Sequence, residues 1–201
     1  ETMIAAVSID LDPLQCYRAI FGRADPPRAQ AAPSVVVPPE RTFPMLESSF
    51  LRWLDLLSDL GVKATFFVVG NTLASPQMVS LGKRALADGH ELANHTMTHP
   101  YDLRSRSVQE IQDEVSGCHE RLKSLFATDA KGVTCPEFDV VGFRTPGYHS
   151  NQKVRDILTS QGYRYDSSAL VSWSYYLLKC LAVTKIRLSG RKSASRIASP
   201  K

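Results

Sequence analysis

The stretch GVKATFFVVG, residues 61–70, decides the fold class of this chain. Its centre is rich in aromatic and β-branched residues, which favour a β-strand. Before it, residues 46–60 carry apolar side chains at the three- and four-residue spacing of a helix, and Gly61 is a typical helix terminator. After it, Ser75 and Pro76 provide the cap and the first position of another helix. The pattern therefore predicts a buried strand between two helices.

The same alternation continues along most of the chain. We predict strands at residues 3–9, 63–69, 91–94, 140–143 and 163–165, and helices at residues 46–60, 76–87, 108–125 and 152–160. Strands and helices that alternate with short connections form parallel sheets with crossover helices, which places the protein in the α/β class. In such folds the carboxyl ends of the strands carry the chemistry, and polar residues of this sequence gather there.

The bulk properties indicate one domain, which we expect to span residues 1–201. The net charge of +4 is small and arises partly from a polar basic tail at about 185–201. No interleaving of aromatic and basic residues accompanies it, so we expect no nucleic-acid partner. Residues 22–45 contain six of the twelve prolines, and we predict a long loop that serves as a lid or a substrate-selecting wall.

Targeting signals are weak in this sequence. No run approaches the ~20 apolar residues of a membrane span, so we expect no transmembrane segment, and a leader peptide is either absent or already removed. The cysteines lack CxxC spacing and resemble neither a zinc ribbon nor a dense disulfide framework; they are Cys16, Cys118, Cys135 and Cys180. We expect a soluble protein, cytoplasmic or associated with the cell envelope, and the sequence leaves the compartment open.

The segment ELANHTMTHP, residues 91–100, places two histidines directly behind a predicted strand. Pro100 disfavours helical dihedral angles at His99, so we expect His95 and His99 to converge from a loop. A pair of exposed loop histidines without any metal is also common. The metal hypothesis gains weight from Asp12, just past the first strand, because two imidazoles and one carboxylate form a zinc site that leaves a position for water.

Asp10 stands two positions before Asp12. If the strand ends there and the backbone turns, Asp12 can bind a metal while Asp10 faces the water. The alternative is a solvated strand end with a turn before Pro13. A DxD pair also occurs in phosphatases that form an aspartyl-phosphate and in nucleotide-sugar transferases, but Leu14 stands where the phosphatase pattern has Thr or Val.

Four segments, in chain order, carry a resemblance to a known family. They are SIDLD (8–12), HTMTH (95–99), FRTP (143–146) and YDSS (165–168). Together they resemble the first four motifs of the NodB-type polysaccharide deacetylases, carbohydrate esterase family 4, and the likeness covers about residues 3–170. The resemblance implies a distorted (β/α) barrel that removes N- or O-linked acyl groups, most simply acetyl, from sugars with a divalent metal such as Zn²⁺ or Co²⁺.

The resemblance also implies a role for each matching residue. Asp12, His95 and His99 would bind the metal, and Asp10 would be the catalytic base. A zinc ion lowers the pKa of its water to about 7 and polarises a carbonyl group, so such a site can hydrolyse an amide at neutral pH. A carboxylate base beside the ion takes the second proton.

Further roles follow from the later motifs. Arg144 would orient the base, and Asp166 would hold Arg144. The backbone N–H of Gly147 would help to form the oxyanion hole, which stabilises the negative charge of the tetrahedral intermediate. Substrate contacts are implied at Pro146, Tyr148 and Trp173.

The sequence departs from the family pattern in two ways. Family members use a late histidine as the general acid, but this chain has no histidine after His149. The predicted strands also stop short of a closed barrel, so the chain is either incomplete at the C-terminus or an inactive relative. We expect a hydrolase acting on a carbohydrate substrate, an N-acylated sugar, polymer or lipid-linked. The alternatives are a deformylase of a lipid-linked amino sugar and an inactive metal- or carbohydrate-binding relative.

Overall fold

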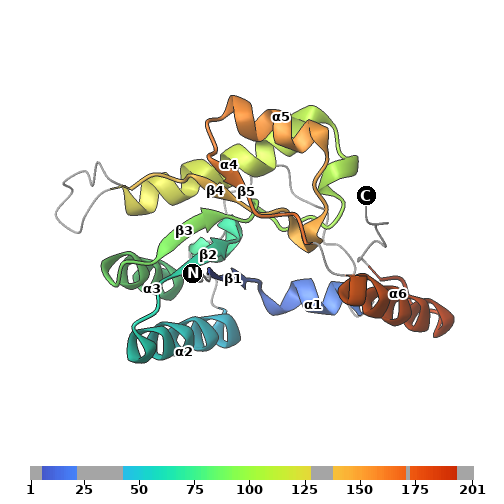
Figure 1. Ribbon diagram of the computed structural model, residues 1–201, viewed down its shortest axis with the longest axis horizontal. Coiled ribbons are helices and arrows are strands. Elements are labelled where there is room, and N and C mark those ends of the chain that lie inside the picture. The colour runs from blue at the N-terminus through green and yellow to red at the C-terminus, as the bar shows by residue number, and fades with distance from the viewer. Residues whose placement is uncertain (1–5, 22–42, 128–137, 171–172, 194–201) are drawn as a thin grey trace, which may run out of the picture.

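The computed structural model describes residues 6–21, 43–127, 138–170 and 173–193. Within that part of the chain, five parallel strands form one sheet in the order β1-β2-β3-β4-β5 (Figure 1). Their bounds are Val7–Leu11 for β1, Ala64–Val68 for β2, Glu91–Asn94 for β3, Gly142–Phe143 for β4 and Tyr165–Asp166 for β5. Because the strand order follows the chain order, the sheet has the topology of a barrel wall.

Helices connect and flank these strands. The α-helices are α1 (Leu14–Ile20), α2 (Pro44–Leu60), α3 (Pro76–Ala87), α4 (Val108–Phe126), α5 (Gln152–Ser160) and α6 (Trp173–Leu188). Short 3₁₀ turns are η1 (Gly70–Ala74), η2 (Leu103–Ser105) and η3 (Pro146–Tyr148). The helices α2 to α5 contact one another in sequence order.

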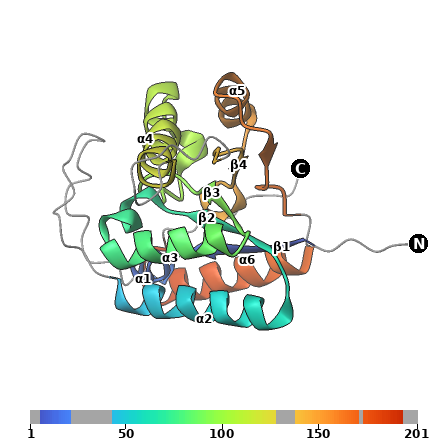
Figure 2. The same cartoon turned by 90° about the vertical axis from the view of Figure 1, so that its left-hand side faces the viewer.

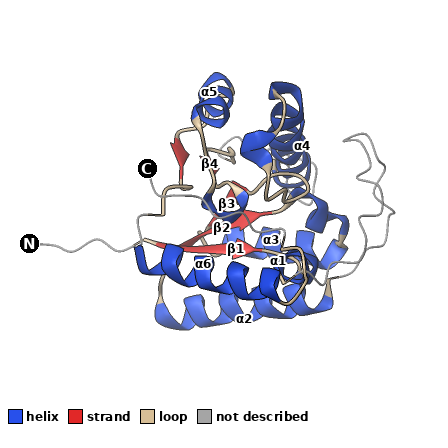
Figure 3. Cartoon of the chain, turned by 90° about the vertical axis from the view of Figure 1, so that its right-hand side faces the viewer, coloured by secondary structure: helices blue, strands red, loops and turns tan. Residues whose placement is uncertain are grey.

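The helices fall into separate groups around the sheet. Seen from opposite sides, α2 and α3 lie beside β1 and β2, whereas α4 and α5 stand beside the later strands (Figures 2 and 3). Helix α6 lies next to α1, and the Ser193 hydroxyl donates to the carbonyl of Ile20 at 2.5 Å. Among the described helices, none combines the length and apolarity that a membrane crossing requires.

Two apolar cores hold the layers together. The larger core joins α2, α3 and α4 to β1, β2 and β3; within it Phe50 and Phe66 are almost fully buried, with ring centroids 4.8 Å apart. The smaller core lies between α4, α5 and β4, and its buried members are Leu103, Ile111, Val115, Phe143, Val154, Ile157 and Leu158. The sheet is therefore anchored by a different core at each end.

Most predicted elements are confirmed. Differences occur in β4, which is Gly142–Phe143 rather than 140–143, in β5, which is Tyr165–Asp166 rather than 163–165, and toward the ends of the chain. Helices 76–87 and 152–160 and strand 91–94 have the predicted bounds. The first strand is Val7–Leu11 rather than 3–9, of which residues 3–5 lie outside the described residues, and α2 begins at Pro44, inside the predicted loop. The rest of that loop, residues 22–42, lies outside the described residues, as does Cys135.

Two helices were not predicted. Helix α1 follows Pro13 directly, and α6 continues to Leu188, so residues 185–188 of the predicted tail are helical. Residues 194–201 lie outside the described part of the chain. The α/β class expected from the sequence is confirmed, because the described strands form one parallel sheet. A single domain over residues 1–201 stays a prediction.

Candidate metal centre

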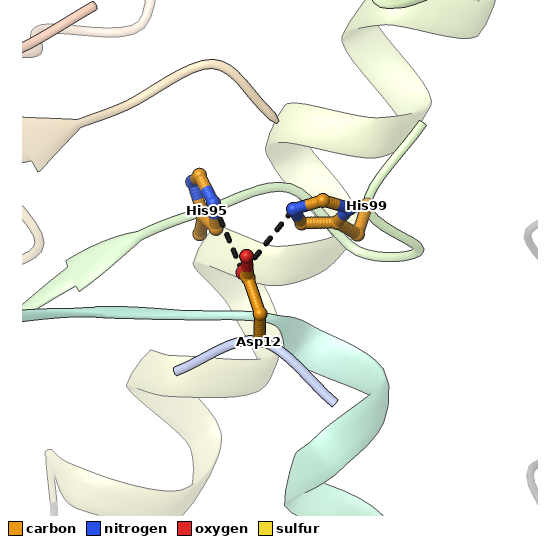
Figure 4. A group of neighbouring side chains, drawn as sticks. All are labelled: Asp12, His95 and His99. Carbon is orange, nitrogen blue, oxygen red and sulfur yellow. Dashed lines mark ion pairs between the residues drawn. The ribbon is translucent and has the colours of Figure 1, made fainter. Parts of the chain in front are cut away.

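Three possible metal ligands meet at the carboxyl ends of β1 and β3. Asp12 follows β1, His95 follows β3, and His99 ends the loop behind it (Figure 4). Oδ1 of Asp12 lies 3.4 Å from Nε2 of His95 and 3.2 Å from Nε2 of His99. Ligand atoms of all three residues lie within 4.8 Å of one another, and both imidazoles are buried. The structure therefore brings together the three residues that the sequence suggested.

A backbone contact fixes the orientation of the first imidazole. Nδ1 of His95 lies 2.7 Å from the carbonyl oxygen of Arg144. Because a carbonyl oxygen only accepts hydrogen bonds, Nδ1 must carry the proton. In the neutral ring, Nε2 then keeps its lone pair, which faces Asp12 and is available to a metal ion.

The electrostatics of the three side chains suit a cation. Burial alone would raise the pKa of Asp12, but the two neighbouring imidazoles hold that pKa well below its usual range. Burial alone would lower the pKa of His95, whereas the neighbouring Asp12 carboxylate raises it. Asp12 therefore stays ionised and favours positive charge between the imidazoles.

Unsatisfied polar atoms test whether these residues fit a metal ion. Oδ1 of Asp12 and both ring nitrogens of His99 are buried without a hydrogen-bond partner among the described residues. Buried polar atoms without partners are rare, and each one needs an explanation. A divalent ion would satisfy Asp12 Oδ1 and one nitrogen of His99, and oxygen with imidazole nitrogen is a ligand set that zinc accepts. The residues therefore fit the expected ion.

Beside this cluster, Arg144 contacts residues that belong to three strands or directly follow them. Its Nη1 donates to Oδ1 of Asp10 at 2.6 Å, and its Nη2 donates to the hydroxyls of Ser8 and Ser167 at 2.8 Å each. Nε donates to the carbonyl of Ser167 at 3.2 Å, and the guanidinium carbon lies 4.0 Å from the ring centroid of Phe67. The predicted contact between Arg144 and Asp10 is thus present, in a fixed geometry.

The expected partner of Arg144 is wrong. Asp166 was predicted to hold it, but the Asp166 carboxylate accepts hydrogen bonds from Ser150 and Ser168 instead. Ser167 takes the expected place because alternate residues of an extended segment point to opposite sides. Serines at strand ends are too common for the sequence alone to single out Ser8 or Ser167.

The expected backbone turn between the two aspartates is also absent. Strand β1 continues through Asp10 to Leu11, and residues two apart on a strand share a face. Ser8, Asp10 and Asp12 therefore follow one another along the same side. This alternation allows β1 and the residue directly after it to supply both a neighbour of the arginine and a possible metal ligand.

The loop after β4 forms another wall of the site. Gly147 has a left-handed φ of 68°, and Tyr148 has one of 62°. The Tyr148 hydroxyl lies 3.4 Å from Oδ2 of Asp10; burial, and then the Asp10 charge, raises the pKa of this tyrosine. Pro146 is buried in the same turn. Trp173 begins α6, but its side chain lies outside the described part of the structure.

Helix α6 reaches this loop through one lysine. Nζ of Lys179 lies 3.1 Å from Nε2 of His149 and 3.4 Å from the carbonyl oxygen of Gly147. Burial lowers the pKa of Lys179. This contact was not predicted, because neither the helix α6 nor a role for Lys179 followed from the sequence.

Comparison with known proteins places this geometry in a family. A family model described as polysaccharide deacetylase matches residues 44–165, more than half of the chain. A chitooligosaccharide deacetylase from Sinorhizobium fredii is 37% identical over 123 residues, which cover 60% of this chain and 48% of that protein. A peptidoglycan-N-acetylglucosamine deacetylase from Bacillus cereus is 32% identical over 124 residues, covering 61% of this chain and 49% of that protein. The matches thus span about half the length of these relatives.

Solved structures agree on the fold. The crystal structure of a putative polysaccharide deacetylase from Mycobacterium smegmatis superposes with a TM-score of 0.58 at 22% identity, over 82% of this chain and 50% of that one. At this identity the likeness concerns the fold alone. Together with the family match and the curated relatives, it identifies the chain as a member of the polysaccharide deacetylases of the NodB type, carbohydrate esterase family 4.

Proposed function

We propose that this chain forms the metal- and base-bearing part of a hydrolase that removes an N-linked acetyl group from an amino sugar of a carbohydrate. The observation that carries the proposal is the placement of Asp10, held by Arg144, beside the cluster of Asp12, His95 and His99. The names of the two curated relatives support the substrate class, since both describe deacetylases of N-acetylated sugars. Removal of an O-linked acetyl group is the same chemistry on an ester.

The three clustered residues would hold a zinc ion. Asp12, His95 and His99 supply one carboxylate and two imidazoles, which is a set of three protein ligands that leaves a position open. When bound there, the ion supplies Lewis acidity toward the acetyl carbonyl oxygen. Co²⁺ accepts the same ligands and serves as a spectroscopic substitute.

Asp10 would act as the general base. Arg144 engages its Oδ1 at 2.6 Å, whereas Oδ2 has the longer 3.4 Å contact with the Tyr148 hydroxyl, so Oδ2 is the oxygen better able to accept a proton from the attacking water. The water oxygen then forms a bond to the acetyl carbon, and the carbonyl π electrons move onto its oxygen. Collapse of this intermediate breaks the C–N bond while the nitrogen takes up a proton, for which the proton accepted by Asp10 is available, and acetate and the amine are released. Because Arg144 is itself held by Ser8 and Ser167, the carboxylate keeps one orientation throughout.

The loop after β4 would contact the substrate. The N–H of Gly147 would donate to the developing oxyanion, a contribution that is typically large for backbone donors fixed in advance. A Cβ at this position would lie 3.2 Å from the ring of Tyr101, so glycine also keeps the turn close to the metal side. Pro146, Tyr148 and Trp173 would border the sugar.

The amine leaving group needs a proton, and the sequence offers no histidine after His149. A relative that binds metal and carbohydrate without turnover is the second hypothesis. A deformylase of a lipid-linked amino sugar remains a third hypothesis. Assays on N-acetylated and N-formylated amino sugars, with binding measured in parallel, separate the three.

The deciding experiment separates ligand from base. We expect one zinc ion per chain, lost in His95→Ala, His99→Ala and Asp12→Ala, as measured by metal analysis of purified protein. Asp10→Asn should keep the ion and lose about 10²–10⁴-fold in turnover of an N-acetylglucosamine oligomer, because it removes a proton acceptor only. Stoichiometric zinc in all three alanine variants would disprove the metal site. An Asp10→Asn protein as active as the parent would disprove the base.

A further inference from the structure

The loop that carries both histidines has a strained backbone. Thr96 and His99 have left-handed φ values of 66° and 60°. Residues other than glycine rarely adopt this conformation, and for a β-branched residue such as Thr96 it is a clear outlier. Such strain persists only where the surrounding structure fixes the backbone, and it is concentrated at functional sites. Some other group must therefore hold the segment between His95 and His99.

A buried carboxylate on α4 reaches the middle of that loop. Oε2 of Glu114 accepts a hydrogen bond from the backbone N–H of Thr98 at 2.8 Å, and its Oε1 accepts one from the Thr98 hydroxyl. The backbone carbonyl of Glu114 accepts the N–H of Met97 at 2.9 Å. One residue of the helix thus binds two successive residues of the loop, between the two strained positions.

The charge of this carboxylate is balanced locally. Nη1 of Arg106 lies 3.4 Å from Oε1 of Glu114, and Nε of Arg106 lies 3.0 Å from Oδ1 of Asp102. Glu114 is 7% exposed, and a buried charge is retained only when it is paired and hydrogen-bonded. The carboxylate is therefore a fixed part of the loop's support rather than a solvated group on the helix surface.

We propose that Glu114 is a positioning residue for the metal site, which holds the His95–His99 loop in the strained conformation that turns His99 toward Asp12. The proposal rests on the proposed metal-dependent function and adds a residue to it. We call the hydrogen bonds from Met97 and Thr98 to Glu114 the clamp. Without the clamp, Thr96 and His99 would leave their left-handed conformations in the metal-free protein, and only a fraction of molecules would hold both imidazoles in place for the ion. The apparent dissociation constant for the ion rises in inverse proportion to that fraction.

The clamp makes a quantitative difference to metal affinity. Loss of partners that orient metal ligands typically costs about 10–100-fold in affinity. We expect this range for Glu114→Gln, which keeps the size of the side chain but loses the charge that pairs with Arg106. Thr98→Val removes only the hydroxyl contact and should lie at the lower end. Neither substitution removes a metal ligand.

The test measures zinc affinity by competition with a chromogenic chelator. The free energy of unfolding of the metal-free variants is measured in parallel by denaturant titration, and the absorption of bound Co²⁺ reports the ligand geometry. Glu120→Gln is the matched control, because Glu120 lies on the same helix but is exposed, and its affinity should equal that of the parent. A weaker affinity in folded Glu114→Gln supports the proposal.

The outcomes separate this proposal from the proposed function. If Glu114→Gln is folded and less stable but binds zinc as tightly as the parent, Glu114 is a structural residue only and the proposal is wrong. If Glu114→Gln does not fold, Thr98→Val decides by the same criterion. A parent protein that binds no zinc overturns both proposals. A parent that binds zinc without deacetylating sugars, with weaker binding in Glu114→Gln, refutes the hydrolase while the clamp stands.

Discussion

The two halves of the sheet differ in how many residues pair between neighbouring strands, although both halves contribute residues to the site. We call the half with more paired residues firmly paired and the other half weakly paired. Strand β1 pairs with β2 over five residues, and β2 pairs with β3 over four. By contrast, β3 meets β4 at one residue pair, and β4 meets β5 at two. The larger core supports the first half, and the smaller core supports the second.

The possible metal ligands and the arginine site fall on different sides of this division. Asp12, His95 and His99 follow β1 and β3, whereas Arg144 and Ser167 follow β4 and β5. We infer that ion binding depends on the firmly paired half, while the orientation of the base depends on the weakly paired half. A substitution in the firmly paired half should therefore weaken ion binding more than it disturbs the base. A substitution in the weakly paired half should disturb the base more than ion binding.

The largest expected effect comes from replacing the arginine itself. Arg144→Lys retains a positive charge but cannot donate to Asp10, Ser8 and Ser167 at once, because an ammonium lacks the planar fork of a guanidinium. We expect turnover to fall about 10²–10⁴-fold, the usual contribution of a positioned base. Zinc affinity should stay close to that of the parent, because the backbone carbonyl that orients His95 is unchanged.

The control for this comparison is Arg155→Lys. Arg155 is exposed on α5, where Nη2 of its guanidinium donates to Oε1 of Gln152 at 2.9 Å. Its turnover should match the parent. Equal loss of zinc and of turnover in Arg144→Lys would show that the two halves of the site are not separable.

A matched pair of core substitutions tests whether the two halves of the sheet differ in stability. Leu54 of α2 lies in the larger core, and Leu158 of α5 lies in the smaller one; both are buried. Either leucine replaced by alanine should cost about 2–5 kcal/mol, from lost burial plus the cavity left behind. We expect Leu54→Ala to lower the free energy of global unfolding and Leu158→Ala to affect mainly the opening of α5, β4 and β5.

Native-state hydrogen exchange measures this difference, because it reports the free energy of opening amide by amide. In Leu158→Ala, amides of β2 should keep their protection, whereas those of α5 should lose it. In Leu54→Ala, both groups should exchange faster. Uniform loss of protection in both variants would mean that the sheet unfolds as one unit.

The elements that sequence could predict are the ones with strong local patterns. Helices at residues 76–87 and 152–160 have capping residues and apolar stripes, and their bounds were confirmed. Helix α1 was missed because it has only seven residues and buries none of them. Helix α6 was missed because its apolar residues do not form one stripe, and Leu177, Leu178 and Leu181 are more than half exposed.

The site residues likewise divide into those that could be predicted from the sequence and those that could not. Asp10, Asp12, His95 and His99 stand at strand ends in motifs, so their convergence could be predicted from parallel topology. The partners of Arg144 could not, because which of two neighbouring residues faces an arginine depends on the pairing of β4 with β5. For Glu114 a signal existed: a carboxylate on the apolar stripe of α4 has to find a partner.

The smallest expected effect tests the weak pairing itself. Gly142 of β4 pairs with Tyr165 of β5, and a Cβ built on Gly142 would meet the ring of Tyr165 at 2.2 Å. That ring crosses β4, and its hydroxyl donates to Oε1 of Glu91 on β3 at 2.8 Å, so one side chain ties three strands together.

Gly142→Ala must displace this ring, and overpacking of this kind costs about 1–3 kcal/mol. Because Arg144 follows directly after β4, two residues beyond Gly142, turnover should fall more than zinc affinity. Denaturant unfolding, zinc competition and turnover assays of Gly142→Ala, Tyr165→Ala and the double variant form a double-mutant cycle. If the ring is the cause, the double variant should lose less stability than the sum of the two single variants, because without the ring the new methyl group has room. Strictly additive losses of stability would instead mean that the destabilisation by Gly142→Ala arises in the backbone. The Tyr165 ring would then not contribute to it.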